Sequence, residues 1–276
     1  MRRRRPCRRP GSPRRRSPWV DRRKPRSRAR TRRASCRIVT YTLAGMRVTV
    51  LELAASWGDP VAVLGEIERR LALGPATDLV VVPEAALHGY VSPEGDFDLT
   101  GFGESLDGPT ARACAALAAT HRTHLVASLV LAEGGAHYNA MTCFGPRGEP
   151  VFVYRKRHPW FPETWATAGA EPPPVVAIDG VMVTIAVCYD LHFIPRDAGR
   201  ELAAADLLLF PSAWVERPDT RAARLVDLAR RFDLHVANAN WAPGVVEVPG
   251  QGGSCIVTPA GKVTTAVSFG RLDLDL

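Results

Sequence analysis

Three polar residues with chemical potential stand where apolar segments end. Glu84 closes "DLVVVPE", Lys156 closes "VFVYRK" and Cys188 closes "VMVTIAVC". Taken singly, each has a simpler interpretation: a turn cap, a solvated charge, and a small buried hydrophobe. Taken together they form a working set. The carboxylate can remove the thiol proton, the thiolate can attack a carbonyl-like carbon, and the ammonium can stabilise the negative charge that develops.

The surrounding pattern predicts the elements that would position these residues. Short apolar runs alternate with amphipathic segments, and turn residues separate them. Helices are predicted over residues 60–73, 108–122, 196–205 and 217–233. Strands are predicted over residues 47–54, 78–84, 123–131, 137–145, 150–156, 181–188, 206–214, 234–240, 252–258 and 262–269. This mixture indicates a layered α/β domain, and because such sheets bind ligands at the carboxyl ends of their strands, the three residues can converge on one crevice.

A long irregular segment separates the lysine from the cysteine. Residues 157–174 read "RHPWFPETWATAGAEPPP", which is rich in proline and aromatic residues and fits neither a helix nor a strand. Long irregular loops in compact domains are commonly functional. We expect substrate specificity to depend on residues 160–171 of this loop together with residues 89–101 and 214–219.

The charge of the chain is unevenly distributed. The formal net charge is +8, but residues 1–45 hold 18 of the 36 basic residues and a single acid, Asp21. Residues 46–276 hold the other 18 basic residues against 27 acidic ones, a net charge of −9. We therefore divide the chain into an Arg/Pro-rich leader, residues 1–45, predicted to be disordered, and one domain, residues 46–276.

Three interpretations of the leader stay open. It could be a nucleic-acid-binding arm, since arginines neutralise phosphates. It could be a targeting peptide, although the apolar run "IVTYTLAGM" is short for a secretory core. We favour a third interpretation, that the leader is non-native sequence upstream of a start at Met46, because GC-rich non-coding sequence encodes Arg, Pro, Ser, Gly and Ala.

The remaining composition excludes several classes of protein. Six cysteines occur, two of them in the leader, and none forms a short CxxC pair, which argues against a disulfide framework and a structural zinc site. No apolar run approaches the length of a membrane span. We expect a cytoplasmic protein that needs no metal and no cofactor, has no membrane partner, and whose folded domain does not bind nucleic acid.

Three segments together resemble one known family. "VVVPEAALHGY", "YRKRHPWFPE" and "AVCYDLHF" are similar to the glutamate, lysine and cysteine signatures of the nitrilase superfamily, the carbon–nitrogen hydrolases. "YNAMTCFGPRGEPVFVYRK", "ELAAADLLLFPSAW" and "GGSCIVTPAGKV" resemble further segments of that family in the same order. The resemblance runs from about Met46 to the C-terminus.

The resemblance implies a fold, an assembly and a mechanism. The fold would be a four-layer αββα sandwich that pairs with a second copy as a homodimer or a higher homo-oligomer. Glu84 would take the proton of Cys188, whose sulfur would form an acyl-thioester, and Lys156 with the backbone N–H of Tyr189 would hold the oxyanion. A second glutamate is expected between the lysine and the cysteine, and we choose Glu163 over Glu171.

Other residues are assigned less directly. His158, Trp160, His192 and Trp214 are candidates for the walls of the substrate pocket. After "CYD" the chain reads two residues longer than the family pattern, which puts Asp197 where a glutamate is expected, with Arg200 as its predicted structural partner. Asp190 is predicted to tie the cysteine turn together.

These observations favour a cysteine-dependent hydrolase of a non-peptide C–N bond. The substrate would be a small amide or an N-carbamoyl compound, and "YRKRHPW" resembles amidases and carbamoylases more than true nitrilases. Two alternatives remain. The domain could be a catalytically idle scaffold that binds a partner, or the leader could make the chain a nucleic-acid-associated protein.

Overall fold

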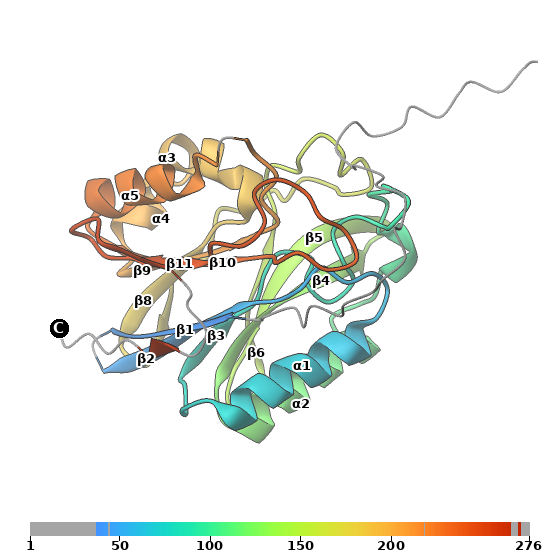
Figure 1. Ribbon diagram of the computed structural model, residues 1–276, viewed down its shortest axis with the longest axis horizontal. Coiled ribbons are helices and arrows are strands. Elements are labelled where there is room, and N and C mark those ends of the chain that lie inside the picture. Colours follow the sequence, from blue (N-terminus) through green and yellow to red (C-terminus); the bar gives the residue numbers. More distant parts are fainter. Residues whose placement is uncertain (1–36, 44, 218, 266–269, 272–276) are drawn as a thin grey trace, which may run out of the picture.

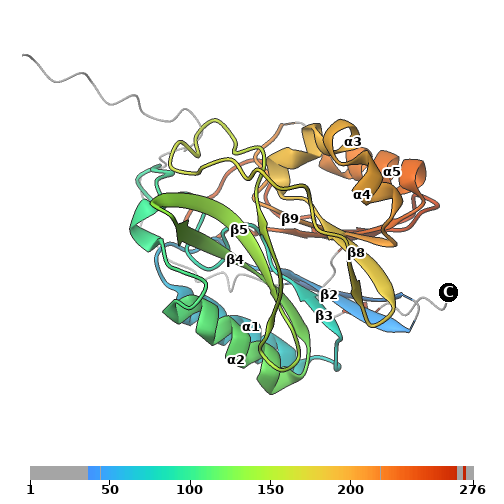
Figure 2. The ribbon, with the colours of Figure 1, turned by 180° about the vertical axis from the view of Figure 1, so that it is seen from behind.

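Two β-sheets pack face to face between two layers of helices (Figure 1). This computed structural model describes residues 37–43, 45–217, 219–265 and 270–271. The helices lie on the outer faces of the sheets, and the view from behind shows the same four layers (Figure 2). The αββα sandwich expected from the sequence is confirmed.

The first sheet has seven strands in the order β13-β1-β2-β3-β4-β5-β6. Its members are β1 (Arg37–Leu43), β2 (Met46–Glu52), β3 (Leu79–Val81), β4 (His124–Glu133), β5 (Ala136–Phe144), β6 (Pro150–Arg155) and β13 (Gly270–Arg271). β2, β3 and β4 run parallel, whereas β4, β5 and β6 form the antiparallel meander that the turn residues predict. The parallel part places the residue after β3 at the carboxyl edge of the sheet.

The second sheet has six strands in the order β12-β11-β10-β9-β8-β7. Its members are β7 (Val176–Ile178), β8 (Val181–Ile185), β9 (Leu207–Ser212), β10 (His235–Asn240), β11 (Cys255–Val257) and β12 (Val263–Thr265). β8, β9 and β10 run parallel. Segments that follow β8 and β9 therefore leave the sheet at one edge.

Five helices complete the outer layers of the described chain. They are α1 (Pro60–Leu73), α2 (Pro109–His121), α3 (Ile194–Asp197), α4 (Gly199–Ala203) and α5 (Arg221–Phe232), with short 3-10 turns η1 (Thr100–Phe102) and η2 (Cys188–His192). α1 and α2 cover the first sheet, and α3, α4 and α5 cover the second. Among the described residues, no helix is both long and apolar enough to cross a bilayer.

The segment that contains β3 is apolar throughout and does not alternate between polar and apolar residues. Val80 packs toward α1 and α2, whereas Val81 packs into the core between the two sheets. Successive side chains of a strand point to opposite faces, and both faces of this sheet are covered. The run "LVVV" is therefore buried throughout.

β1 consists of residues that the sequence analysis assigned to the leader. Residues 37–43 pair antiparallel with β2, from Arg37 opposite Glu52 to Leu43 opposite Met46, and β13 pairs on the other side of β1. The end of the predicted leader, residues 37–43, is thus a strand of the first sheet. Residues 1–36 lie outside the described residues, so their predicted disorder stays a prediction.

Candidate active site

Each of the three predicted catalytic residues lies just beyond a strand. Glu84 follows β3 by three residues, Lys156 follows β6 directly, and Cys188 follows β8 by three residues and opens η2. The strands are slightly shorter than predicted, but the edge is the one expected. Two residues come from the first sheet and one from the second, so the site lies between the two sheets.

Lys156 is fully buried between two carboxylates. Its Nζ donates to Glu84 Oε1 at 2.7 Å and to Glu163 Oε1 at 2.6 Å. An ammonium has three protons, so one remains for a ligand. Glu163 is therefore the second glutamate at this site, whereas the rival Glu171 is exposed to solvent.

Two residues that the sequence analysis did not single out complete this cluster. Asn139 Nδ2 donates to Glu84 Oε1 at 2.8 Å and to Glu163 Oε2 at 3.3 Å, and so links the two carboxylates. The Tyr90 hydroxyl donates to Glu163 Oε1 at 2.5 Å. A polar amide within the apolar strand segment "HYNAM" was the available signal for Asn139. For Tyr90, the available signal was its position in the loop after Glu84.

The two carboxylates share one cation, and this changes how Glu163 titrates. Burial raises the pKa of Glu163, and the charge of Glu84 raises it further, whereas Lys156 and the Tyr90 hydroxyl act in the opposite direction. The net pKa of Glu163 is higher than usual. For Lys156, burial lowers the pKa, but the charges of Glu163 and Glu84 outweigh it, so the ammonium stays charged.

The Cys188 thiol is neutral at rest. Burial raises its pKa well above the usual range and the Glu84 charge adds to this, while Lys156 opposes it. The backbone N–H of Ala213 donates to Glu84 Oε2 at 2.9 Å and also favours the thiolate of Cys188. A buried neutral thiol becomes a nucleophile only when a base removes its proton. Glu84 is close enough for its charge to act on the thiol.

Asp190 fastens the turn that carries the thiol. Cys188 has a φ of +44°, in the left-handed region that side chains disfavour. Asp190 Oδ2 accepts from the N–H of Val187 at 3.0 Å and from the Tyr154 hydroxyl at 2.9 Å. These bonds tie both ends of the turn to β6, so the predicted structural role of Asp190 has a clear geometric basis.

His158 lies away from the pocket, contrary to its prediction as a wall residue. Its N–H and Nδ1 both contact Asp190 Oδ1, at 2.9 and 2.8 Å, its Nε2 lies 3.2 Å from Asp197 Oδ2, and its ring stacks on Phe193. It therefore supports the cysteine turn. The predicted Asp197–Arg200 pair is also corrected, because the Asp197 carboxylate pairs with Arg196 and His158 instead. The two extra residues in this segment displace the predicted register.

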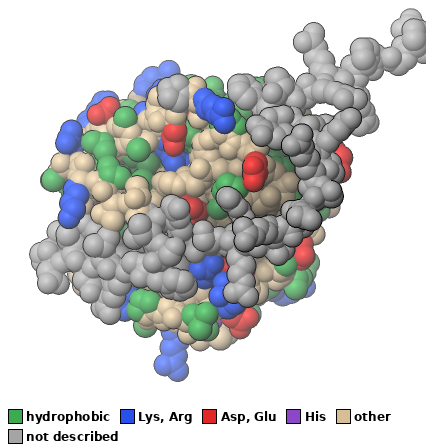
Figure 3. Space-filling view, viewed as in Figure 1, with side chains coloured by type: hydrophobic (Ala, Val, Ile, Leu, Met, Phe, Trp, Pro, Cys, Tyr) green, Lys and Arg blue, Asp and Glu red, His purple; other side chains and the backbone are tan. Residues whose placement is uncertain are grey.

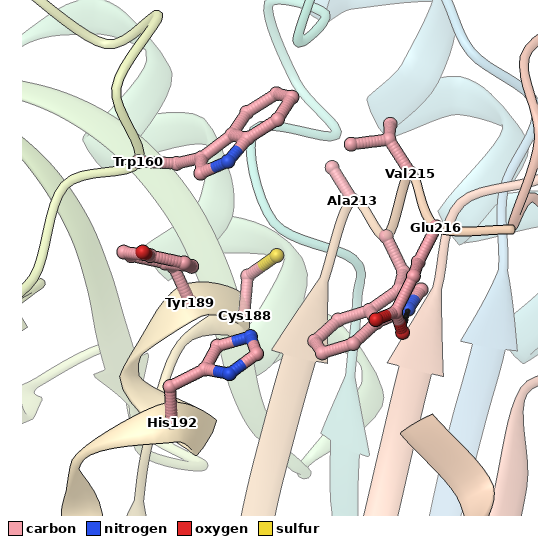
Figure 4. Close-up of a pocket in the computed structure, with 8 residues that line it drawn as sticks. Trp160, Cys188, Tyr189, His192, Ala213, Val215 and Glu216 are labelled. Atoms are coloured by element: carbon pink, nitrogen blue, oxygen red, sulfur yellow. Dashed lines mark hydrogen bonds between the residues drawn. The ribbon is translucent and has the colours of Figure 1, made fainter. Parts of the chain in front are cut away.

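A cavity of about 220 Å³ opens beside the thiol (Figure 4). Its lining combines aromatic, small apolar and polar side chains: Trp160, Cys188, Tyr189, His192, Ala213, Trp214, Val215 and Glu216. The Cys188 sulfur points up between Trp160 and Ala213 in this view. The structure thus brings three of the four predicted wall residues, Trp160, His192 and Trp214, to the cavity.

Tyr189 and Glu216 are two further residues of the cavity lining. Tyr189 follows Cys188 at the start of η2 and lines the cavity, and the oxyanion role of its backbone N–H stays a prediction. Glu216 was not singled out, although it falls within the predicted specificity segment 214–219. It lies two residues past Trp214 on the segment that leaves β9.

The described residues hold no cluster of three or more His, Cys, Asp or Glu side chains arranged to bind a metal ion. The four cysteines of the described domain, Cys114, Cys143, Cys188 and Cys255, are free and buried. Burial raises the pKa of Cys114 and Cys143 to about 12 and that of Cys255 to about 11. Cys188 is the one among them that lines a cavity.

The chain is similar in sequence to curated proteins. "Hydrolase in pqqF 5'region" of Pseudomonas protegens is 31% identical over 257 residues, which are 87% of this chain and 88% of that protein. A formamidase of Pseudomonas syringae is 30% identical over 159 residues, which are 56% of this chain and 45% of that enzyme.

Solved structures match the fold. A cysteine-to-alanine mutant of the amidase from Nesterenkonia sp. AN1, in complex with butyramide, has a TM-score of 0.70 and 23% identity, covering 87% of this chain and 90% of that one. A CN-hydrolase superfamily protein from Xanthomonas campestris has a TM-score of 0.66 and 22% identity, covering 84% and 86%. The family profile for carbon–nitrogen hydrolases matches residues 30–274. The chain therefore belongs to the carbon–nitrogen hydrolase family of the nitrilase superfamily.

Proposed function

We propose that this protein hydrolyses the C–N bond of small amides through an acyl-thioester on Cys188. The observation that carries the proposal is the buried Glu84–Lys156–Glu163 cluster beside a thiol that faces a small cavity. A structural role alone gives no reason to bury two carboxylates and an ammonium together, since burying charges is costly.

The first half-reaction forms the thioester. Glu84 accepts the thiol proton as the Cys188 sulfur bonds to the carbonyl carbon, and the carbonyl π electrons move onto oxygen. The free N–H of Lys156 and the backbone N–H of Tyr189 hold that oxyanion, which exists only at and near the transition state. The oxyanion then collapses, the C–N bond breaks, and the leaving nitrogen takes the proton from Glu84.

The second half-reaction releases the acid. Glu84, again a carboxylate, accepts a proton from water as the water oxygen attacks the thioester carbon. The carbon–sulfur bond then breaks and the thiolate regains the proton. Glu163 holds Lys156 in place by accepting its hydrogen bond, and Asn139 holds Glu84 by donating to it.

The size of the cavity favours a short acyl group. At about 220 Å³ the cavity is smaller than the roughly 300–1,000 Å³ of typical small-molecule sites. Relatives named formamidase and a structural neighbour crystallised with butyramide point to amides of this size. N-carbamoyl compounds are the second candidate substrates, since they present the same carbonyl flanked by nitrogen.

The test is ammonia release by the full chain and by its Cys188→Ala variant. The panel holds formamide, butyramide, ω-amides of dicarboxylic acids, N-carbamoyl amines and short nitriles. We expect turnover of short amides that disappears in the variant, and mass spectrometry should detect an acyl adduct on Cys188 after rapid quenching. Folded protein that releases no ammonia from any class would support the alternative of an idle scaffold instead.

A further inference from the structure

We propose that Glu216 selects substrates, so that the preferred amides carry a cationic amine at the end remote from the scissile bond. This inference rests on the proposed amidase activity and adds the class of substrate. It starts from the charge of the cavity. Of the eight residues that line it, none is Lys or Arg, and Glu216 is the one carboxylate.

Three hydrogen bonds to a single oxygen hold this carboxylate in place. Glu216 Oε2 accepts from Trp214 Nε1 at 3.1 Å, from the N–H of Thr220 at 3.1 Å and from the Thr220 hydroxyl at 2.7 Å. Oε1 receives no hydrogen bond from the part of the chain that the structure describes. One oxygen is therefore anchored, and the other is available to a ligand in the cavity.

The carboxylate is ionised at neutral pH. Partial burial acts to raise the pKa of Glu216, but the hydrogen bonds from Thr220 and Trp214 and the charge of Arg224 outweigh it, so the pKa lies below its usual value. Arg224 does not line the cavity, and its guanidinium Nε donates to the Thr220 hydroxyl. It weakens the negative potential at Glu216 without reversing it.

The neighbouring histidine does not supply a compensating positive charge. Burial lowers the pKa of His192, and the charge of Arg224 lowers it further, against an opposing effect of Glu216. The His192 ring stacks parallel to Trp214 at 5.8 Å and forms part of the aromatic wall. Lys156 is fully buried beneath the cavity between its two carboxylates.

The walls of the cavity suit the same ligand. Trp160 and Trp214 both contribute to the lining of the cavity, and Figure 4 shows the Trp160 ring above the Cys188 sulfur. Aromatic faces attract ammonium groups, and a carboxylate adds a charge-assisted hydrogen bond. A carboxylate at that end of the substrate would instead meet Glu216 as a like charge.

The experiment compares three amides of matched length: 4-aminobutanamide, pentanamide and glutaric acid monoamide. They differ only in the terminal group, which is an ammonium, a methyl or a carboxylate. We expect kcat/KM for the cationic amide to exceed that for pentanamide about tenfold, because hydrogen bonds to charged groups contribute that much. The carboxylate-bearing amide should be the poorest of the three.

Two variants of the full chain test whether Glu216 causes the preference for the cationic amide. Glu216→Gln keeps the size of the side chain and should reduce the cationic-to-neutral ratio of kcat/KM to about one. Glu171→Gln removes the same charge from an exposed position and should leave the ratio as in the original protein. The inference about Glu216 is overturned if the cationic-to-neutral ratio of kcat/KM is near one in the original protein, or if Glu216→Gln leaves that ratio unchanged. In either case, turnover of pentanamide would still support the amidase activity. Absence of turnover with all three amides overturns the proposed amidase itself.

Discussion

Lys156 carries one positive charge between two carboxylates, and this imbalance decides how the cluster responds to substitution. Glu84, Lys156 and Glu163 are all buried, so each charge depends on its neighbours for stabilisation. Removing the cation leaves two carboxylates facing each other, whereas neutralising one carboxylate leaves a matched pair.

The two substitutions should therefore separate stability from activity. We expect Lys156→Met to destabilise the fold by about 3–5 kcal/mol, since it strands two buried charges. Glu163→Gln should change the free energy of unfolding by only about 1 kcal/mol, because the raised pKa of Glu163 shows that its charge is already disfavoured. It should still lower kcat about 100-fold, since Lys156 loses one of its two anchors. Urea denaturation and amide turnover measure the two effects, and equal stability losses would contradict this account.

The raised pKa of Cys188 predicts how its reactivity depends on pH. A free cysteine thiol ionises at about pH 8.5. Because the pKa of Cys188 is well above the usual range, its thiolate fraction should still be increasing where that of free cysteine levels off. The rate of alkylation by iodoacetamide should thus keep rising beyond pH 9, measured by mass spectrometry with Cys188→Ala as the control. A plateau below pH 8 would mean that the thiolate is stabilised at rest.

The residues that could be predicted from the sequence are those with a chemical role at a strand end. Glu84, Lys156 and Cys188 are in that group, whereas Glu163 in the following loop was predicted from the family resemblance. Asn139 was not predictable in the same way, since an amide in a strand gives no sign of which carboxylates it will meet across 55 residues. His158 was misplaced because a histidine beside a motif can face either the pocket or the supporting turn.

At the scale of elements, the loop that carries Glu163 is attached to the end of β6. The N–H of Gly169 donates to the carbonyl of Lys156 at 2.9 Å, and the N–H of Thr167 donates to the carbonyl of His137 at 2.7 Å. A Cβ at Gly169 would lie 2.2 Å from the Arg155 carbonyl oxygen, so the loop approaches the strand more closely than a side chain allows. Glycine at this position is what lets Glu163 reach Lys156.

Gly169→Ala should therefore disturb the site from a distance. We expect a loss of about 1–3 kcal/mol in stability, as in other overpacked positions, together with a fall in kcat as Glu163 moves away. Gly101→Ala is the matched control, because a Cβ at Gly101 meets no atom within 4 Å. Thermal unfolding and turnover check both variants. Unchanged activity in Gly169→Ala would show that the loop can shift without moving Glu163.

Long amphipathic elements were predicted well, and short ones less so. The pattern over residues 60–73 gave the bounds of α1. In the helix predicted over residues 217–233, Leu225, Leu228 and Ala229 belong to the core and Phe232 packs against it. Three-residue strands such as β7 and β12 carry too few residues for a periodic signal. β1 was not predicted, although it contains β-branched residues. The arginine-rich sequence before it led us to assign residues 37–43 to the leader.

At the scale of the whole molecule, β1 provides a test of the predicted start at Met46. A chain of residues 46–276 lacks β1, so β2 would become an open edge with unpaired backbone groups. We expect this truncated chain to have a lower melting temperature than the full chain and to aggregate on size-exclusion chromatography. A chain of residues 37–276 keeps β1 and is the control. Equal stability of the two truncations would show that β1 contributes nothing and would favour the start at Met46.

The surface and assembly of the molecule leave two predictions open. On the face in Figure 3, basic and acidic side chains of the described residues are interspersed, in keeping with a folded part that holds 18 basic and 27 acidic residues from residue 46 onward. Any nucleic-acid binding would then depend on the leader, which lies outside the described residues. The homo-oligomer and the cytoplasmic location remain predictions from the family resemblance and the composition.

The connectivity of the two sheets has a consequence for the order of folding. β1 to β6 form from one continuous stretch and β7 to β12 from the next, and only β13 returns to the first sheet. Each sheet can thus gain its pairings from nearby residues, which is fast, before the two sheets dock. The bond from Ala213 to Glu84 spans 129 residues and forms only at docking. A refolding intermediate with most of its secondary structure should accordingly lack a competent nucleophile, and enzymatic activity should return after the circular dichroism signal rather than with it.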